Sequence, residues 1–178
     1  MTICNSCGLP HDLPTDADTK VKTHCRACAV RMESHPSTRI EPLEQADLEL
    51  VLAWRSHPQI YAHFRQQNSP LDWEEHSSWF KSRDEDRYDF MISFDGRRVG
   101  VVNIDASNEV GIFLGDFSAH GQGVATAALE WLCHRFADRA PLFAEIHDEN
   151  EASKRLFKQC GFYRCGRDGE WIQYTYGP

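Results

Sequence analysis

Residues 111–125 decide how this chain folds: they run Gly111-Ile112-Phe113-Leu114-Gly115 and, after a short loop, His120-Gly121-Gln122-Gly123-Val124-Ala125. The first part predicts a strand, and the second a glycine-rich entry into a helix, because apolar residues recur at helical spacing from Val124 onward. Glycines at a helix start let backbone N–H groups approach an anion such as a phosphate. Neither a P-loop nor G-x-G-x-x-G is present, and the pattern alone also fits an ordinary tight turn.

The composition is that of an ordinary globular protein. The chain has 178 residues, 41% of them hydrophobic and 26% charged, which suits one compact domain with a small appendage. A formal net charge of −8 argues against a general nucleic-acid binder. No apolar run approaches the roughly 20 residues that cross a membrane, and no signal peptide is recognisable. We therefore expect a cytoplasmic protein with no membrane or nucleic-acid partner, whose oligomeric state the sequence leaves open.

Two C-x-x-C pairs stand near the N-terminus, 17 residues apart. This spacing is typical of a four-cysteine structural zinc site, whose ligands here would be Cys4, Cys7, Cys25 and Cys28. A redox dithiol or unconnected thiols are the alternatives. The stretch between the pairs is polar and lacks a core, so a bound Zn²⁺ would supply stability. We predict a zinc module over residues 1–36 with a structural or protein-contact role, since its charges balance.

The main domain, residues 37–178, is expected to be an α/β (α+β) domain built on a mixed sheet. The expected strands cover residues 38–42, 88–94, 99–104, 109–114, 142–146, 162–165 and 171–176, and the expected helical segments 46–55, 60–64, 72–80, 124–137 and 150–160. A parallel relation is expected between residues 109–114 and 142–146, because a helix crosses between them.

Three motifs in this order, Glu109–Leu114, His120–Ala125 and Asn150–Phe162, resemble the GNAT superfamily of acyl-CoA-dependent N-acetyltransferases over about residues 38–176. The resemblance implies a mostly antiparallel sheet flanked by helices, with acetyl-CoA as co-substrate. In the family, the glycine motif binds the CoA pyrophosphate with backbone amides, while the preceding strand and the third motif contact the pantetheine arm. The implied CoA-binding residues are Ile112, Phe113, Leu114, His120, Gly121, Gln122, Gly123, Val124, Ala125, Asn150, Ser153 and Phe157.

The sequence departs from the family pattern at two of these positions. His120 stands where the family has Arg or Gln, which leaves phosphate binding to the backbone. Many relatives carry a tyrosine where this chain has Phe157, and a phenylalanine cannot donate a proton to the departing thiolate. Phe157 is therefore expected to lie in the core or against pantetheine.

The reaction requires a general base, because an ordinary amine is largely protonated at pH 7. Glu109 is the candidate, since its strand is expected to run toward the acetyl group and the family often places a catalytic glutamate there. A surface carboxylate paired with a cross-strand cation is the alternative.

Within the superfamily, three pieces are most similar to the branch that acetylates ribosomal-protein N-termini, polyamines and nucleotide-linked amino sugars: Trp54-Arg55 with Pro58, Glu75-His76 with Trp79-Phe80, and Gly100–Ile104. Trp54-Arg55 followed by Glu75-His76 looks most like the enzymes that acetylate a 4-amino sugar on a nucleotide carrier. Trp54 and Arg55 are the candidate substrate-binding residues, with Arg55 pairing with an acceptor phosphate. A core tryptophan and a salt-bridged arginine are the alternatives. The implied acceptor is an amino sugar on a nucleotide carrier. A protein N-terminus or lysine is the second possibility, and a zinc-containing protein that binds CoA without turnover is the third.

Overall fold

The structure is a computed structural model that describes residues 1–12 and 23–177. Its elements in chain order are β1 (Thr2–Ile3), β2 (Pro10–His11), α1 (Arg26–Ser34), β3 (Thr38–Pro42), the 3-10 turn η1 (Gln45–Asp47), α2 (Leu48–Arg55), α3 (Pro58–Tyr61), α4 (Trp73–Lys81), β4 (Tyr88–Phe94), β5 (Arg97–Ile104), β6 (Val110–Leu114), η2 (Phe117–Ala119), α5 (Val124–Arg135), η3 (Ala137–Arg139), β7 (Leu142–His147), α6 (Glu151–Gln159), β8 (Tyr163–Asp168) and β9 (Trp171–Tyr176). Most of the polar stretch between the two cysteine pairs, residues 13–22, lies outside the described residues.

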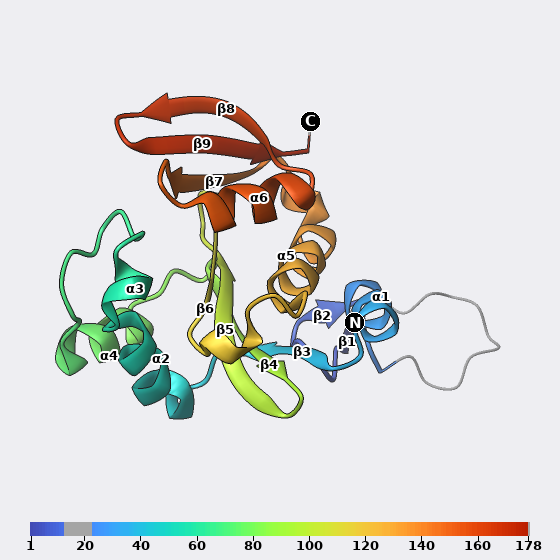
Figure 1. Ribbon diagram of the computed structural model, residues 1–178. Helices are drawn as coiled ribbons and strands as arrows, with labels where there is room; N and C mark the ends of the chain where they lie inside the picture. Colours follow the sequence, from blue (N-terminus) through green and yellow to red (C-terminus); the bar gives the residue numbers. More distant parts are fainter. Residues whose placement is uncertain (13–22, 178) are drawn as a thin grey trace.

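The order of elements confirms the expected mixed α/β fold (Figure 1). Most of the observed boundaries differ from the expected ones by up to three residues. Two of these differences have a clear local cause. The helix expected over residues 46–55 begins as a 3-10 turn, because Glu44 and Asp47 form a capping box around η1. The helical turn expected at residues 60–64 starts earlier, at Pro58, since proline suits a first helical turn and His57 caps it.

The strands form two larger antiparallel sheets beside the small β1–β2 pair. One sheet has the order β3-β4-β5-β6 and the other β7-β9-β8. Strands β6 and β7 are parallel neighbours only at the bridge between Glu109 and Phe143, where the Phe143 N–H donates to the Asn108 carbonyl over 2.9 Å. The expected parallel relation is therefore confirmed at one point, beyond which the two strands part.

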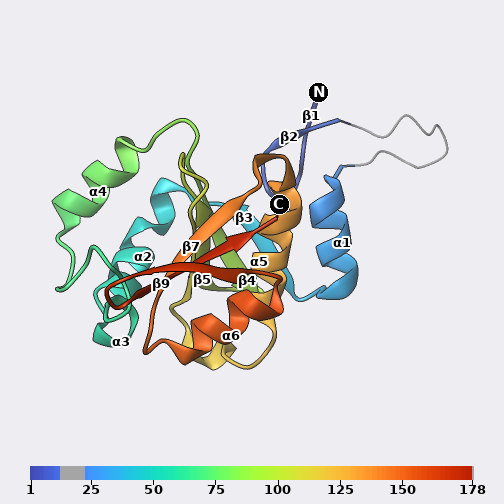
Figure 2. The ribbon, with the colours of Figure 1, turned by 90° about the horizontal axis from the view of Figure 1, so that it is seen from above.

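Side-chain alternation along β4 and β5 places two cores on opposite faces of the first sheet. Phe90, Ile92 and Val102 point into the core under α5, while Met91 and Val101 point to the core under α2 and α4. Figures 1 and 2 show α5 on one side of this sheet and α2 to α4 on the other. Side chains of β6 pack into both cores: Val110, Ile112 and Leu114 into the core under α5, and Phe113 into the other.

A search for membrane spans among the described residues finds no helix that combines enough length with enough apolar character to cross a bilayer.

Candidate active site

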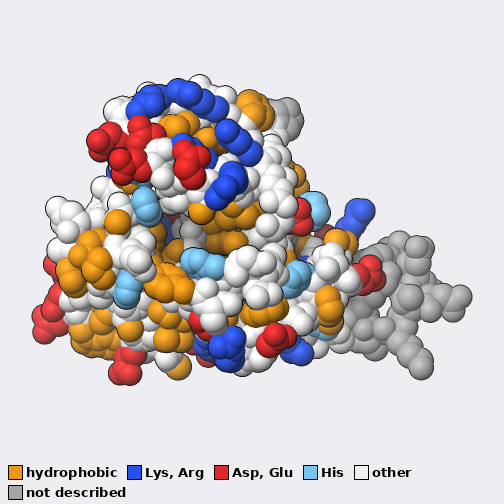
Figure 3. Space-filling model, in the orientation of Figure 1, with side chains coloured by type: hydrophobic (Ala, Val, Ile, Leu, Met, Phe, Trp, Pro, Cys, Tyr) orange, Lys and Arg blue, Asp and Glu red, His pale blue; other side chains and the backbone are white. Residues whose placement is uncertain are grey.

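The gap between β6 and β7 is the centre of the candidate site. Each strand is the edge of its sheet, and beyond the Glu109–Phe143 bridge no described strand pairs with the facing edge of β6. The predicted pantetheine-binding residues Ile112, Phe113 and Leu114 lie half-buried on β6. Figure 3 shows a hollow near the centre of this face, with hydrophobic side chains at its floor. An unpaired strand edge can bond an extended ligand arm as a further strand would.

The glycine-rich loop follows β6 after the short turn η2 and leads into α5. Gly121 and Gly123 have φ values of +73° and +76°, in the left-handed region that favours glycine. Residues 120–123 form a turn, and among the described residues the amides of Gly121, Gln122, Gly123 and Val124 donate no backbone hydrogen bond of good geometry. They stand at the positive end of a 12-residue helix, which is an environment that favours an anion.

The side chains of this loop contribute less than its backbone. His120 and Gln122 are exposed, whereas Val124 is buried and Ala125 is half-buried. The His120 ring lies edge-on to Phe117, with 5.3 Å between centroids. The arrangement agrees with an anion site made mainly by N–H groups.

The third motif forms the start of α6. The Asn150 side chain caps this helix by accepting a hydrogen bond from the Ser153 N–H over 3.1 Å, which leaves its amide NH₂ for a ligand. Ser153 is half-buried beside it. Phe157 is buried and its ring packs on Phe162 at 4.9 Å, so it belongs to the main core.

Glu109 lies where β6 and β7 begin to separate. One carboxylate oxygen of Asp105 accepts the backbone N–H groups of Ser107 and Glu109, each over 2.9 Å, and fixes this turn. Partial burial, then the negative charges of Asp105 and Glu145, raise the pKa of the Glu109 carboxyl above its ordinary value. The side chain as a whole is exposed, so water moderates this effect without reversing it.

The ion pairs among the described residues do not include Glu109. The geometry thus leaves the Glu109 carboxylate available at the opening of the gap.

Trp54 and Arg55 end α2 beside the far end of β6. A Cβ at Gly115 would lie 2.1 Å from atoms of the Trp54 indole, so only glycine allows this approach. The Arg55 guanidinium lies over the Phe64 and Trp79 rings, at 5.5 and 5.8 Å, and its Nη2 donates to Gln67. Burial, followed by the nearby positive charge of Arg87, lowers the pKa of Arg55. Trp54 therefore reaches the site, whereas Arg55 is held among aromatic rings.

An ionic contact that the sequence did not indicate closes one side of the gap. Arg65, after α3, donates to both oxygens of Glu145 on β7 over 2.7 Å and also to Asp168 on β8. Its guanidinium lies 5.8 Å from the Trp171 ring. The partners are 80 and 103 positions away along the chain, so no local pattern announces them.

The four predicted metal ligands come together at the N-terminus. The sulfurs of Cys4, Cys7, Cys25 and Cys28 are buried and lie within 4.8 Å of one another. The Cys7 and Cys25 sulfurs are 3.9 Å apart, close to the edge of about 3.8 Å of a tetrahedron with Zn–S bonds of about 2.3 Å. Hydrogen bonding with Cys25, followed by burial, raises the pKa of the Cys7 thiol above its ordinary value. A bound cation would favour the thiolate form of the ligands.

The surroundings of the cluster also fit a bound cation with four thiolates. The Cys25 N–H donates to the Cys4 sulfur over 3.3 Å. Arg31 is 3% exposed, and its Nε and Nη1 have no hydrogen-bond partner among the described residues. An unpartnered buried guanidinium beside four thiolates would balance their excess negative charge. The cluster is compatible with a zinc module.

This cysteine module, meaning β1, β2 and α1 with their four cysteines, packs against α5. The Trp131 indole N–H donates to the Cys28 sulfur over 3.1 Å, and Arg135 donates to the Pro10 carbonyl over 2.8 Å. His35, which follows α1, contacts the Gln122 carbonyl at 3.0 Å. The sequence pattern did not predict these contacts, because they join residues that are far apart in the chain. His35 lies in the segment between the cysteine module and the main domain.

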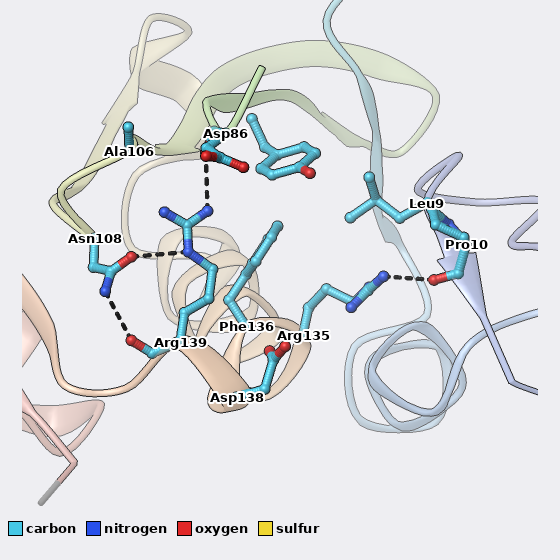
Figure 4. Close-up of a pocket in the computed structure, with 10 residues that line it drawn as sticks. Leu9, Pro10, Asp86, Ala106, Asn108, Arg135, Phe136, Asp138 and Arg139 are labelled. Atoms are coloured by element: carbon cyan, nitrogen blue, oxygen red, sulfur yellow. Dashed lines mark hydrogen bonds between the residues drawn. The ribbon is translucent and has the colours of Figure 1, made fainter. Parts of the chain in front are cut away.

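A surface pocket of about 420 Å³ lies elsewhere, between the cysteine module and the end of α5 (Figure 4). Its arginines are already engaged: Arg139 donates to Asn108 and to the Asp86 carbonyl, and Arg135 to Pro10. The predicted site residues do not line it.

The comparisons with known proteins agree with this geometry. The family model described as "Acetyltransferase (GNAT) domain" matches residues 38–163. The uncharacterized protein MJ1062 of Methanocaldococcus jannaschii is 39% identical over 147 residues, which cover 75% of this chain and 30% of that protein. The chain thus spans less than a third of the length of this relative.

Two solved structures share the fold. A domain from Methanocaldococcus jannaschii is 35% identical, with a TM-score of 0.70 over 77% of this chain and 96% of that one. Spermidine N-acetyltransferase from Vibrio cholerae, solved with CoA and spermine, is 16% identical, with a TM-score of 0.66 over 79% of this chain and 94% of that one. Because the family model covers more than half of the sequence, the chain belongs to the GNAT acetyltransferase family.

Proposed function

We propose that this chain transfers an acetyl group from acetyl-CoA to a primary amine of a small molecule. One observation carries the proposal: the unpaired edge of β6 leads, through η2, into the left-handed glycines at the start of α5. The pantetheine arm has amide groups that match the hydrogen-bonding groups of a strand edge, and its pyrophosphate matches the loop amides. The strand edge and the glycine-rich loop are adjacent in the chain, as the pantetheine arm and the pyrophosphate are adjacent in CoA.

In the transfer, the neutral amine attacks the thioester carbon, the C–N bond forms and the C–S bond breaks. Glu109 takes the proton that the amine must lose, directly or through water, and the CoA thiolate leaves and is protonated. We assign to backbone amides near Leu114 the stabilisation of the negative charge that develops on the carbonyl oxygen. Phe157 is buried in the core, so the proton for the thiolate comes from water or another group.

Acidic side chains beside the gap favour an acceptor with positive charge. Glu145 lies close enough to Glu109 to raise its pKa, and Asp148, Asp168 and Glu170 stand at the nearby ends of β7, β8 and β9. Figure 3 shows acidic and basic side chains above the hollow. Arg65 and Arg167 neutralise part of this charge. A polyamine or another polycationic amine would be attracted here.

The finer candidate, an amino sugar on a nucleotide carrier, depends on Trp54 and Arg55. Trp54 packs against Gly115 at the site, which supports a role in acceptor binding. Arg55 would have to reach a phosphate from among the Phe64 and Trp79 rings. A protein N-terminus or lysine, recognised with help from the cysteine module, and CoA binding without turnover are the competing functions.

The test is release of the CoA thiol from acetyl-CoA with polyamines, amino sugars on nucleotide carriers, and peptides with a free N-terminus or lysine. We expect turnover with at least one small amine. Turnover confined to nucleotide amino sugars, and lost in Arg55→Met but not in the exposed control Arg39→Met, would support the nucleotide acceptor. Peptide-only turnover would favour the protein acceptor, and tight CoA binding without any turnover would contradict the enzyme.

We also propose that Cys4, Cys7, Cys25 and Cys28 hold a structural Zn²⁺, supported by the spacing of their sulfurs. Metal analysis should find one Zn²⁺ per chain, and Cys25→Ser should lower both metal content and stability. None of the seven cysteines, all described, forms a disulfide, which fits a reducing compartment such as the cytoplasm. A metal-free chain with unchanged stability would contradict the zinc site.

A further inference from the structure

His35 connects the segment after α1 to the glycine-rich loop. Its Nε2 lies 3.0 Å from the Gln122 carbonyl oxygen, and its Nδ1 lies 2.7 Å from the Thr38 hydroxyl. The Phe94 ring packs on its other side, with 5.9 Å between centroids. The imidazole is thus held at three points, and one of them is the backbone of the proposed pyrophosphate cradle.

The direction of the hydrogen bond between His35 and Gln122 follows from the chemistry of the two groups. A carbonyl oxygen only accepts, so the Nε2 of His35 carries the hydrogen and donates it to Gln122. In the neutral ring, Nδ1 then accepts from the hydroxyl of Thr38, which is fully buried. The Gln122 carbonyl therefore fixes the tautomer of His35, and the Thr38 hydroxyl, which can donate or accept, complements it.

The hydrogen bond from His35 orients the planar peptide group between Gln122 and Gly123. In a trans peptide, the carbonyl of one residue and the N–H of the next point in opposite directions. With the Gln122 carbonyl turned toward His35, the Gly123 N–H must point away from the imidazole. Gly123 also leaves room for the ring, since a Cβ there would lie 3.3 Å from Nε2 of His35.

We propose that His35 is a positioning residue for CoA: by holding the Gln122 carbonyl inward, it keeps the Gly123 amide facing the pyrophosphate. The inference rests on the proposed function, because it presumes that this loop binds CoA. His35 touches the loop and not the ligand, so its effect falls on affinity for the part of CoA that the loop holds.

Binding of CoA and of pantetheine, which lacks the pyrophosphate, tests this with three variants of the full chain. Asparagine reproduces Nδ1 of His35 but not Nε2, whereas glutamine reaches the Nε2 position. We expect His35→Asn to raise the Kd for CoA about tenfold, as loss of an oriented hydrogen bond does, and His35→Gln to restore most of the affinity. The control His134→Asn changes an exposed histidine on α5 and should leave the Kd unchanged.

The Kd for pantetheine separates positioning from general damage. His35→Asn should leave it within about twofold of that of the unaltered chain, because pantetheine does not use the loop amides. The inference is overturned if His35→Asn binds CoA as His134→Asn does, or if it weakens pantetheine as much as CoA. If the unaltered chain binds pantetheine and CoA equally, or binds neither, the proposed cradle itself is wrong.

Discussion

The indole N–H of Trp131 donates a hydrogen bond to the sulfur of Cys28 over 3.1 Å, between residues 103 positions apart. Trp131 lies in the middle of α5, whose first turn begins at the glycine-rich loop, and Cys28 is one of the four clustered cysteines. Both side chains are buried in the same core. The cysteine module is therefore packed onto the helix that carries the candidate CoA site.

Removing this hydrogen bond should destabilise the chain. We expect Trp131→Phe to lower the free energy of unfolding by about 2 kcal/mol, because it leaves a sulfur without its donor and a small void in the core. Urea denaturation measures the change. The control Trp73→Phe alters a tryptophan that is 44% exposed and should change stability by less than about 0.5 kcal/mol. Equal effects of the two variants would contradict the assigned role.

Metal removal should weaken CoA binding as well as stability. Without a cation, four crowded thiols cannot all ionise, so the module loosens and its contacts to α5 weaken. Calorimetric titration of CoA before and after treatment with a chelator measures this, and adding back Zn²⁺ should restore affinity. Unchanged CoA affinity in the chelated chain would show that the module does not support the loop.

The two left-handed glycines should respond differently to alanine. Alanine at either position costs about 1 kcal/mol of strain because of the positive φ. At Gly121 the new methyl group meets open space, but at Gly123 it presses on the His35 ring. Gly123→Ala should thus be the more destabilising change in urea denaturation. In a His35→Ala background its excess cost should vanish, and an excess that persists would exclude His35 as its cause.

Glu109→Gln should lower kcat by about 100-fold or more, because the amide cannot accept the proton of the amine. In the unaltered chain, kcat/KM should rise with pH as Glu109 ionises, at a pKa above the ordinary 4.5. The variant should lose this dependence. A rate and pH profile that match those of the unaltered chain would remove Glu109 from the mechanism.

Ionisation of Glu109 should also lower the stability of the folded chain, whereas it raises kcat/KM. The folded state holds the Glu109 proton more tightly than the unfolded state, so this group's contribution is complete below its ordinary pKa and is lost as pH rises through the raised one. Glu109→Gln should therefore gain thermal stability relative to the unaltered chain as the pH rises above the ordinary pKa of about 4.5. A loss of stability over this range would mean that the carboxylate is a structural partner.

The sequence predicted features that depend on local spacing. The order of helices and strands followed from apolar periodicity, and the four cysteines from their pairing in two C-x-x-C motifs. The sequence also singled out the glycines of the loop. In the structure Gly121 and Gly123 have a positive φ, a conformation that few other residues adopt.

Long-range contacts had no such signal. The Arg65–Glu145 pair and the His35–Gln122 contact join residues 80 and 87 positions apart and depend on how whole elements pack. The parting of β6 and β7 after one bridge was not predictable either, because the apolar pattern of a strand does not say which edge stays unpaired.

The most direct test of the account is an NMR titration of the ¹⁵N-labelled chain with CoA. The account predicts the largest amide shifts at residues 121–125 and along Ile112–Leu114, with little change around the pocket near Tyr88 and Arg139. Shifts centred on that pocket, with the loop and β6 unaffected, would contradict the proposed CoA site.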